Sequence, residues 1–175
     1  LWNKWFSSTY PNGTLLKSAS SSDVWLIQSD KKRKFKNTSV LITRADPKMI
    51  VTVPDAELSK YEIGSEITFP NYSILKSNNI YYLLDYDTLR PFVSYDVVKK
   101  LGYNPQEIVE VKPIDLDGLQ AGKSITADAY SPQGVIYKIG ADQYFLIKDG
   151  NAYPLMHDAV AKANYNNLNI EDKTS

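Results

Sequence analysis

The chain has 175 residues, and its 20 lysines and arginines are balanced by 20 aspartates and glutamates, so the formal net charge is zero. A neutral chain has no overall field that attracts nucleic acid or an anionic membrane. The hydrophobic fraction of 43% supplies a packed core and argues against disorder, and the absence of cysteine excludes disulfides, thiolate metal ligands and a cysteine nucleophile.

The beginning of the chain carries no targeting signal that we recognise. Residues 1–6 are too short and too polar for the apolar part of a signal peptide, and no apolar run approaches the ~18 residues of a membrane span. Because the chain begins at Leu1 rather than methionine, we expect it to be a mature or excised piece of a longer protein. Residues 1–10 are predicted to form an N-terminal linker.

A short motif then occurs nearly three times. The segment 11–18 (PNGTLLKS) returns at 70–77 (PNYSILKS) and, less closely, at 132–138 (PQGVIYK). Self-similarity at a spacing of about 60 residues indicates tandem repeats. We predict three repeats, 11–69, 70–131 and 132–175, of which the third is truncated or is a terminal cap.

Each repeat is predicted to open with a three-stranded antiparallel meander. Polar turns separate three short strands, and Asp149-Gly150-Asn151 is the clearest hairpin signal among them. The expected strands are 14–18, 24–27 and 32–36 in the first repeat, 73–77, 80–84 and 88–93 in the second, and 135–139, 144–147 and 152–156 in the third.

The middle strand of each meander is apolar at successive positions. Side chains on a strand alternate between its two faces, so both faces must be covered. We expect the helix of the same repeat on one face and a neighbouring repeat on the other.

A short helix should follow each meander, because Asn37, Ser94 and the pair His157-Asp158 are residues that cap a first helical turn. The second helix is expected to end at Gly102. An extra strand follows at 50–53 and 108–111, and then a helical turn at 55–59 and 115–119. A last strand at 67–68 and 125–126 is missing from the third repeat.

These elements predict an α+β, sheet-rich chain whose repeats pack into one compact unit. A unit of about 60 residues buries only ~60% of its surface alone, so we expect the repeats to share a core.

No residue pattern points to a catalytic or metal site. His157 is interpreted as a polar residue at a helix start. The pairs Asp85 with Asp87 and Asp115 with Asp117 resemble a hydrolase dyad, but we interpret them as turn residues. We predict no cofactor and no metal, and the alternative of a carboxylate-dependent glycan hydrolase stays open.

The basic run 31–36 (KKRKFK) has no basic counterpart in the other repeats. We therefore interpret it as a solvated strand whose lysines resist edge pairing, with binding of nucleic acid or an acidic polymer as an alternative.

Binding is the function class that the residues favour most. The loop tyrosines Tyr86, Tyr130 and Tyr153 offer flat, amphipathic surfaces for sugar rings or proteins. Lysines recur at Lys17, Lys76 and Lys138, where edge protection competes with binding of an acidic partner. These six residues are our candidate binding residues.

The motifs also resemble a known kind of sequence. The runs 13–17, 24–27 and 32–35, with the echoes 89–92 and 101–103, resemble tandem repeats of poorly characterised bacterial secreted and cell-surface proteins. Lys34 departs from the proline found at positions 91 and 154. The resemblance implies an extracellular or cell-envelope location, such as the cell wall, and supplies no catalytic residue.

We therefore expect a non-catalytic extracellular or cell-envelope repeat module that binds glycan or protein, or that spaces other domains.

Overall fold

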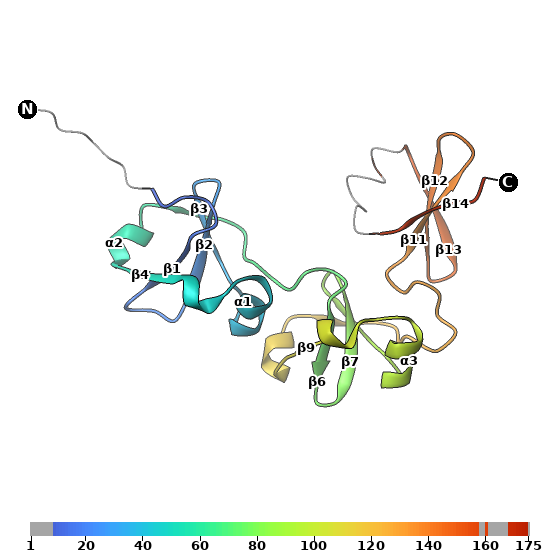
Figure 1. Cartoon of the computed structure of the whole chain (residues 1–175), viewed down its shortest axis with the longest axis horizontal. Helices are drawn as coiled ribbons and strands as arrows, with labels where there is room; N and C mark the ends of the chain where they lie inside the picture. Colours follow the sequence, from blue (N-terminus) through green and yellow to red (C-terminus); the bar gives the residue numbers. More distant parts are fainter. Residues whose placement is uncertain (1–8, 158–159, 161–167, 175) are drawn as a thin grey trace, which may run out of the picture. The chain divides into compact units, whose positions relative to one another are not determined.

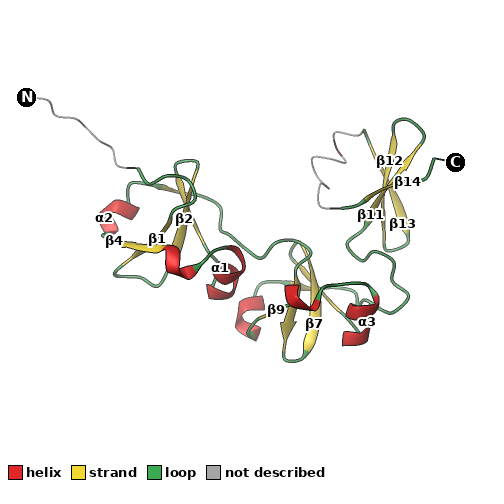
Figure 2. Cartoon of the chain, viewed as in Figure 1, coloured by secondary structure: helices red, strands yellow, loops and turns green. Residues whose placement is uncertain are grey.

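The computed structural model describes residues 9–157, 160 and 168–174. The chain divides into two compact units, Leu1–Pro70 and Asn71–Ser175, so the expectation of one compact unit is wrong. Both units combine small sheets with short helices, which confirms an α+β, sheet-rich chain (Figures 1 and 2).

Unit 1 contains a five-stranded sheet in the order β4-β1-β2-β3-β5. Strands β1, β2 and β3 form the predicted antiparallel meander, and β4 and β5 pair in parallel with β1 and β3. The sequence does not predict the two-residue strand β5. The bounds are β1 (Leu15–Ser18), β2 (Val24–Gln28), β3 (Lys31–Lys34), β4 (Ile50–Val53) and β5 (Glu62–Ile63).

The helix α1 (Thr38–Arg44) begins where the sequence predicts. The Asn37 side chain accepts a hydrogen bond of 2.8 Å from the Val40 amide, which satisfies one free donor of the first turn. A 3-10 helix, η1 (Pro47–Met49), and the short helix α2 (Asp55–Leu58) follow.

Both faces of this sheet are covered from within unit 1. Leu15 and Leu16 are adjacent and therefore point to opposite faces, yet both are buried. One face packs with α1, whose Val40 and Leu41 are buried. On the other face Leu16 belongs to a cluster with Leu58 of α2 and three further residues, Ile27, Val53 and Tyr61. The expected cover from a neighbouring repeat is therefore wrong for this sheet, because α2 provides it.

Unit 2 contains two sheets, and the first of them repeats the strand order of unit 1. Its order is β10-β8-β7-β6-β9, with an antiparallel meander β6-β7-β8 and parallel partners on both sides. The bounds are β6 (Ile74–Ser77), β7 (Ile80–Asp85), β8 (Thr88–Pro91), β9 (Val109–Glu110) and β10 (Gln120–Ala121).

The helix α3 (Tyr95–Lys100) begins after Ser94, as predicted, and the Ser94 hydroxyl accepts from the Val97 amide at 3.4 Å. Two 3-10 helices follow, η2 (Pro105–Glu107) and η3 (Pro113–Leu116). The last strands expected at 67–68 and 125–126 are single parallel bridges, from Ile67 to Phe35 and from Ile125 to Phe92.

The third sheet has four strands in the order β13-β12-β11-β14. Its meander was expected at this position, and β14 pairs with β11 in parallel. The helix predicted from His157-Asp158 lies largely outside the described residues. Tyr72 packs against buried clusters of both sheets of unit 2. The bounds are β11 (Val135–Ile139), β12 (Gln143–Lys148), β13 (Asn151–Leu155) and β14 (Ile170–Asp172).

Ser18 and Ser77 end corresponding strands but have different surroundings. Both are buried. The Ser18 hydroxyl donates to the carboxylate of Asp55, which also accepts from Ser20. In unit 2 the second residue after the buried valine is Pro113 instead of an aspartate, and the Ser77 hydroxyl has no hydrogen-bond partner among the described residues.

We therefore expect opposite effects from one substitution at the two positions. Ser18→Ala should destabilise unit 1 by about 1 kcal/mol, because a made hydrogen bond is lost. Ser77→Ala should leave the stability of unit 2 unchanged or raise it, because an unpaired buried hydroxyl is removed. Amide hydrogen exchange of β1 and β6 in the full chain measures both, and equal losses at the two sites would contradict the prediction.

Candidate functional site

The two five-stranded sheets carry an arginine at the same position of the face that packs with α1 or α3. We call this face the helix side. Arg33 lies opposite Leu26 in unit 1, and Arg90 lies opposite Leu83 in unit 2. A buried phenylalanine, Phe35 or Phe92, follows two residues later on the same face.

A glycine next to each arginine leaves room for its side chain. A β-carbon on Gly64 would lie 3.0 Å from Cγ of Arg33. A β-carbon on Gly122 would lie 2.9 Å from Cγ of Arg90 and 2.5 Å from Cγ2 of Thr88. The close approach of the arginine side chain therefore explains why each of these two positions is a glycine.

In unit 2 the arginine is buried under the third sheet, and only 6% of Arg90 is exposed. Its Nη2 donates to Oδ1 of Asp149 at 2.7 Å, and its Nη1 donates to the carbonyl of Pro132 at 2.9 Å. Both partners belong to the third sheet or the turn before it. The guanidinium thus joins the two sheets of unit 2 by charge-assisted hydrogen bonds.

Asp85, the last residue of β7, completes this cluster. Its Oδ2 accepts from Nζ of Lys148 at 2.5 Å and lies 3.7 Å from Nη1 of Arg90. The interpretation of Asp85 as a turn residue is therefore wrong, because it is a strand residue in an ion-pair network. Its neighbour Asp87 does serve the turn and accepts from the Thr88 hydroxyl at 3.1 Å. The other predicted carboxylate of this type, Asp115, caps η3 by accepting from the Lys112 amide at 3.1 Å.

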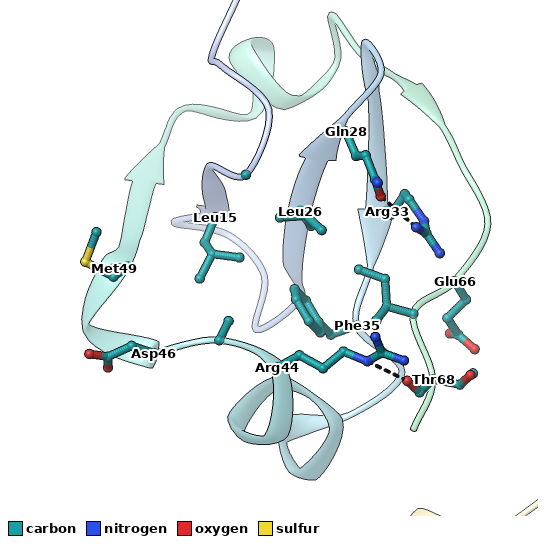
Figure 3. A pocket seen from close by; sticks show the side chains of 13 residues that line it. Leu15, Leu26, Gln28, Arg33, Phe35, Arg44, Asp46, Met49, Glu66 and Thr68 are labelled. Carbon is teal, nitrogen blue, oxygen red and sulfur yellow. Dashed lines mark hydrogen bonds between the residues drawn. The ribbon is translucent and has the colours of Figure 1, made fainter. Parts of the chain in front are cut away.

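In unit 1 the corresponding face is hollow. A pocket of about 610 Å³ lies beside α1, with Leu15, Leu26 and Phe35 as its apolar part (Figure 3). Arg33, Arg44, Glu66 and Thr68 lie at one side, and Asp46 and Met49 lie at the opposite side (Figure 3).

The two arginines of the pocket have neutral hydrogen-bond partners. Arg33 donates from Nε to the Ser65 carbonyl at 2.9 Å and from Nη1 to Oε1 of Gln28 at 2.7 Å. Arg44 donates from Nε to the Thr68 carbonyl at 3.0 Å. Partial burial, with a further contribution from the positive charge of Arg33, lowers the pKa of Arg44.

Two sequence differences distinguish the open helix side of unit 1 from the covered helix side of unit 2. Gln28 ends β2 where Asp85 ends β7, so unit 1 lacks the internal carboxylate. Tyr103 precedes the cap residue of η2, whereas Ala45 precedes that of η1. The Tyr103 ring packs edge-on against Phe92 with centroids 5.5 Å apart, and its hydroxyl donates to Oε1 of Gln133 at 2.6 Å.

The three candidate tyrosines are exposed and come from three separate segments of the chain. Tyr86 lies in the β7–β8 turn and is 54% exposed, and Tyr153 lies on β13 and is 50% exposed. Tyr130 is 61% exposed and lines a cavity of about 300 Å³ beside Arg90. Its hydroxyl bonds to Glu171 at 3.0 Å, and this bond is the main cause that raises the pKa of Tyr130 to about 12.

The three recurring lysines lie on interior strands, so edge protection is the wrong explanation for them. Lys76 and Lys138 pair with acids on the neighbouring parallel strand, Glu110 at 3.2 Å and Asp172 at 3.7 Å. Lys17 has Thr52 at that position instead. In unit 2 these lysines thus connect two strands.

The basic run of β3 does not form one cationic surface. Lys31 and Lys34 pair with Glu62 at 3.6 Å and Asp23 at 2.9 Å. Lys32 donates to the Leu58 carbonyl at 2.8 Å on the α2 face, whereas Arg33 points to the helix side. Because β3 pairs with both β2 and β5, it is not an edge strand, and edge protection is wrong here too.

Other classes of site gain no residues from the structure. Within 9–157, 160 and 168–174, no three His, Asp or Glu side chains are close enough to hold a metal ion. His157 is exposed, and its carbonyl accepts from the Val160 amide at 3.0 Å. In the same ranges, no helix has both the length and the apolar character needed to cross a membrane.

Sequence reasoning does not identify Arg33, Arg44 and Arg90 as site residues. The available signal is the recurrence of an arginine two residues before a phenylalanine, at 33–35 and 90–92. That signal is hidden in the first case by the surrounding lysines, which suggest a solvated strand.

No protein-family model and no curated protein matches the chain. Among solved structures, the chain is similar to a chain of an intact ESX-5 inner membrane complex, at 13% identity and a TM-score of 0.26. The match covers 93% of this chain and 50% of that chain, so this chain spans about half the length of the chain it matches. A likeness at this TM-score carries no argument.

The two arginines should respond differently to replacement by leucine. Arg90→Leu leaves the carboxylates of Asp85 and Asp149 without their guanidinium and should cost about 3 kcal/mol in unit 2. Arg33→Leu, whose partners are neutral, should cost less than about 1 kcal/mol in unit 1. Hydrogen exchange of β11–β13 and of β1–β3 reports the two losses, and a larger loss for Arg33→Leu would refute this assignment.

Tyr103 should make unit 2 sensitive to alkali. Burial raises the pKa of Tyr103 from 10.0 to about 12, opposed in part by the charge of Arg90. The neutral phenol is therefore favoured in the folded state, so its contribution is complete below pH 10 and disappears as the pH rises towards 12. Between these values unit 2 of the wild type should lose more stability than unit 2 of Tyr103→Phe, as measured by urea unfolding at each pH. Parallel curves would contradict the assignment.

Proposed function

We propose that the chain is a non-catalytic module of three tandem repeats that binds a partner protein through the helix side of its first sheet. One observation carries this proposal. The same arginine-bearing face is covered by the third sheet in unit 2 and is an open pocket in unit 1. A face that already holds a folded segment in one unit is suited to hold one in the other.

The strand orders support the tandem-repeat part of the proposal. The first two sheets have the same order and the same parallel and antiparallel pairings, and the described residues of the third sheet provide counterparts of four of the five strands. Three copies of one unit account for this similarity.

Protein is favoured over glycan as the partner by the position of the aromatic rings. Sugar rings stack on exposed aromatic faces, whereas the pocket aromatic Phe35 is buried. The exposed tyrosines Tyr86, Tyr130 and Tyr153 come from separate segments of unit 2. The pocket instead offers guanidinium groups and an apolar floor, which is typical of protein recognition.

We place this module outside the cytoplasm, at the cell surface or in the cell envelope. The support is the similarity of its motifs to the repeats of secreted and surface proteins. The hydrolase alternative is weakened because the Asp85 side chain is 11% exposed and its Oδ2 is held between Lys148 and Arg90, so this carboxyl group does not face a substrate.

Selection from a phage-displayed peptide library on the immobilised full chain tests the proposal. We expect peptides to be enriched over an albumin control and to lose binding to a Leu26→Lys variant, which fills the pocket with a charged side chain. An Ile63→Lys variant, which changes an exposed residue outside the pocket, should bind as the wild type does. Absence of enrichment would contradict a peptide-binding function.

A separate assay addresses catalysis. Incubation of the chain with cell-wall glycan should release no reducing ends above those of a heat-denatured sample. Release that an Asp85→Asn variant abolishes would establish the hydrolase in its place.

A further inference from the structure

We propose that the pocket of unit 1 binds a turn of a partner protein that presents a carboxylate to Arg33 and Arg44. This inference rests on the proposed function and specifies the chemistry of the partner. It goes beyond that function because a protein-binding pocket could equally take a neutral or purely apolar segment.

The arrangement around Arg90 is the internal template for this partner. There a guanidinium donates to the backbone carbonyl of Pro132 and to the carboxylate of Asp149, and both acceptors belong to tight turns. In unit 1 the same side chain lies at the same register, where its Nη1 donates to Gln28 and no described residue is a recorded acceptor for its Nη2, the atom that binds the carboxylate in unit 2. A turn with a carbonyl and an aspartate would therefore reproduce a contact that this fold already makes.

The charges of Arg33 and Arg44 have no ion-pair partner at short range, although Asp46 and Glu66 also line the pocket. Among the described residues, no carboxylate oxygen lies within 4.0 Å of a side-chain nitrogen of Arg33 or Arg44. The described side-chain hydrogen bonds of Arg33 use Nε and Nη1, and that of Arg44 uses Nε. The remaining N–H groups of the two side chains have no recorded acceptor among the described residues, and a guanidinium stays charged under all ordinary conditions.

The two arginines also influence each other. The charge of Arg33 contributes to the lowered pKa of Arg44, which means that the two guanidiniums repel each other. A carboxylate between them would relieve this repulsion and form charge-assisted hydrogen bonds with both.

Positive backbone dihedrals mark Ser29, Tyr86 and Asp149 as the first residues of three corresponding turns. Of these three residues only Asp149 carries a carboxylate, and it is engaged by Arg90. Unit 1 therefore has no acid at this position of the turn, and we assign the carboxylate to a partner protein.

The pocket has the size for such a ligand. Its volume of about 610 Å³ is within the range of sites that hold compact ligands, and it accommodates a few residues of a turn. Leu15, Leu26 and Phe35 would pack against the apolar part of the turn, while the arginines fix its acid.

Two blocked peptides, Ac-Pro-Asp-Gly-NH2 and Ac-Pro-Asn-Gly-NH2, provide the direct test. Each is titrated into the ¹⁵N-labelled full chain, and the side-chain Nε–Hε signals of Arg33 and Arg44 are followed by NMR. We expect the aspartate peptide to shift both signals and the asparagine peptide to bind about tenfold more weakly, because a charged hydrogen bond is replaced by a neutral one. The affinity of the aspartate peptide should fall as salt is added.

Arg33→Gln and Arg44→Gln should each weaken the aspartate peptide by about tenfold or more. Lys48→Gln removes an exposed cation of the neighbouring η1 that does not line the pocket, and it should leave the affinity unchanged. Backbone spectra of each variant show that unit 1 is folded, and Arg44 is exposed, so its replacement should leave the fold intact.

Three binding results would overturn this inference. The first is equal binding of the two peptides, and the second is unaltered binding of the aspartate peptide by both arginine variants. The third is tighter binding of glucuronate than of the aspartate peptide, which would make an acidic sugar the ligand. Self-association of the chain that an Asp149→Asn variant removes would also overturn it, since the occupant would then be a second copy. A neutral peptide from the library that binds the pocket would leave the proposed function standing while this inference fails.

Discussion

Each five-stranded sheet carries, at the same register, an arginine that lies on the helix side and cannot lose its charge. A guanidinium in such a place needs acceptors for its N–H groups and an opposite charge to offset its desolvation. In unit 2 both needs are met from two sheets, because Asp85 lies on the same sheet and Asp149 and Pro132 come from the next. In unit 1 carbonyl and amide oxygens meet the first need only. That difference separates a face used for internal packing from a face available to a partner.

The five-stranded sheets can be short because helical segments cover the helix side of each sheet. In unit 1 a helical segment covers the opposite side as well. In unit 1 α1 and α2 come from the same stretch of about 60 residues as the strands, and the cluster of Leu16, Ile27 and Leu58 closes the second face. A core of this kind does not need a neighbour to hide its apolar strand. It follows that contact between the two sheets of unit 2 can be determined by polar groups such as Arg90.

The sequence predicts the regular part of this fold well. Apolar runs between polar turns locate the meanders, and the caps Asn37 and Ser94 locate the helices, because both signals depend on neighbours in the chain. The strands β5 and β10 are not predicted, since two residues carry no pattern. The role of Asp85 is not predicted either, because its partner Lys148 is 63 positions away and nothing local marks the pair.

The candidate site was harder to predict for the same reason. Arg33 is one cation among five in the run 31–36, and only the alternation of the strand sends it to the helix side while Lys32 goes to the other. The tyrosines attract attention by their number, yet Tyr86 is informative chiefly because it occupies the position of Asp149.

The differences between the two arginine faces form a coherent set. In unit 2 the Tyr103 ring fills the helix side and Asp85 adds a negative charge to it. Asp149 then holds the third sheet against this face through Arg90. Unit 1 has Gln28 and Ala45 instead, so it loses an acid and a large ring together. Loss of the ring alone would leave a hollow with its charge satisfied, and loss of the acid alone would leave an unpaired charge beneath a filled face. Only the joint loss gives a cavity whose wall carries guanidinium groups that are hydrogen-bonded but have no ion-pair partner among the described residues, which is the combination that recognition of a carboxylate requires.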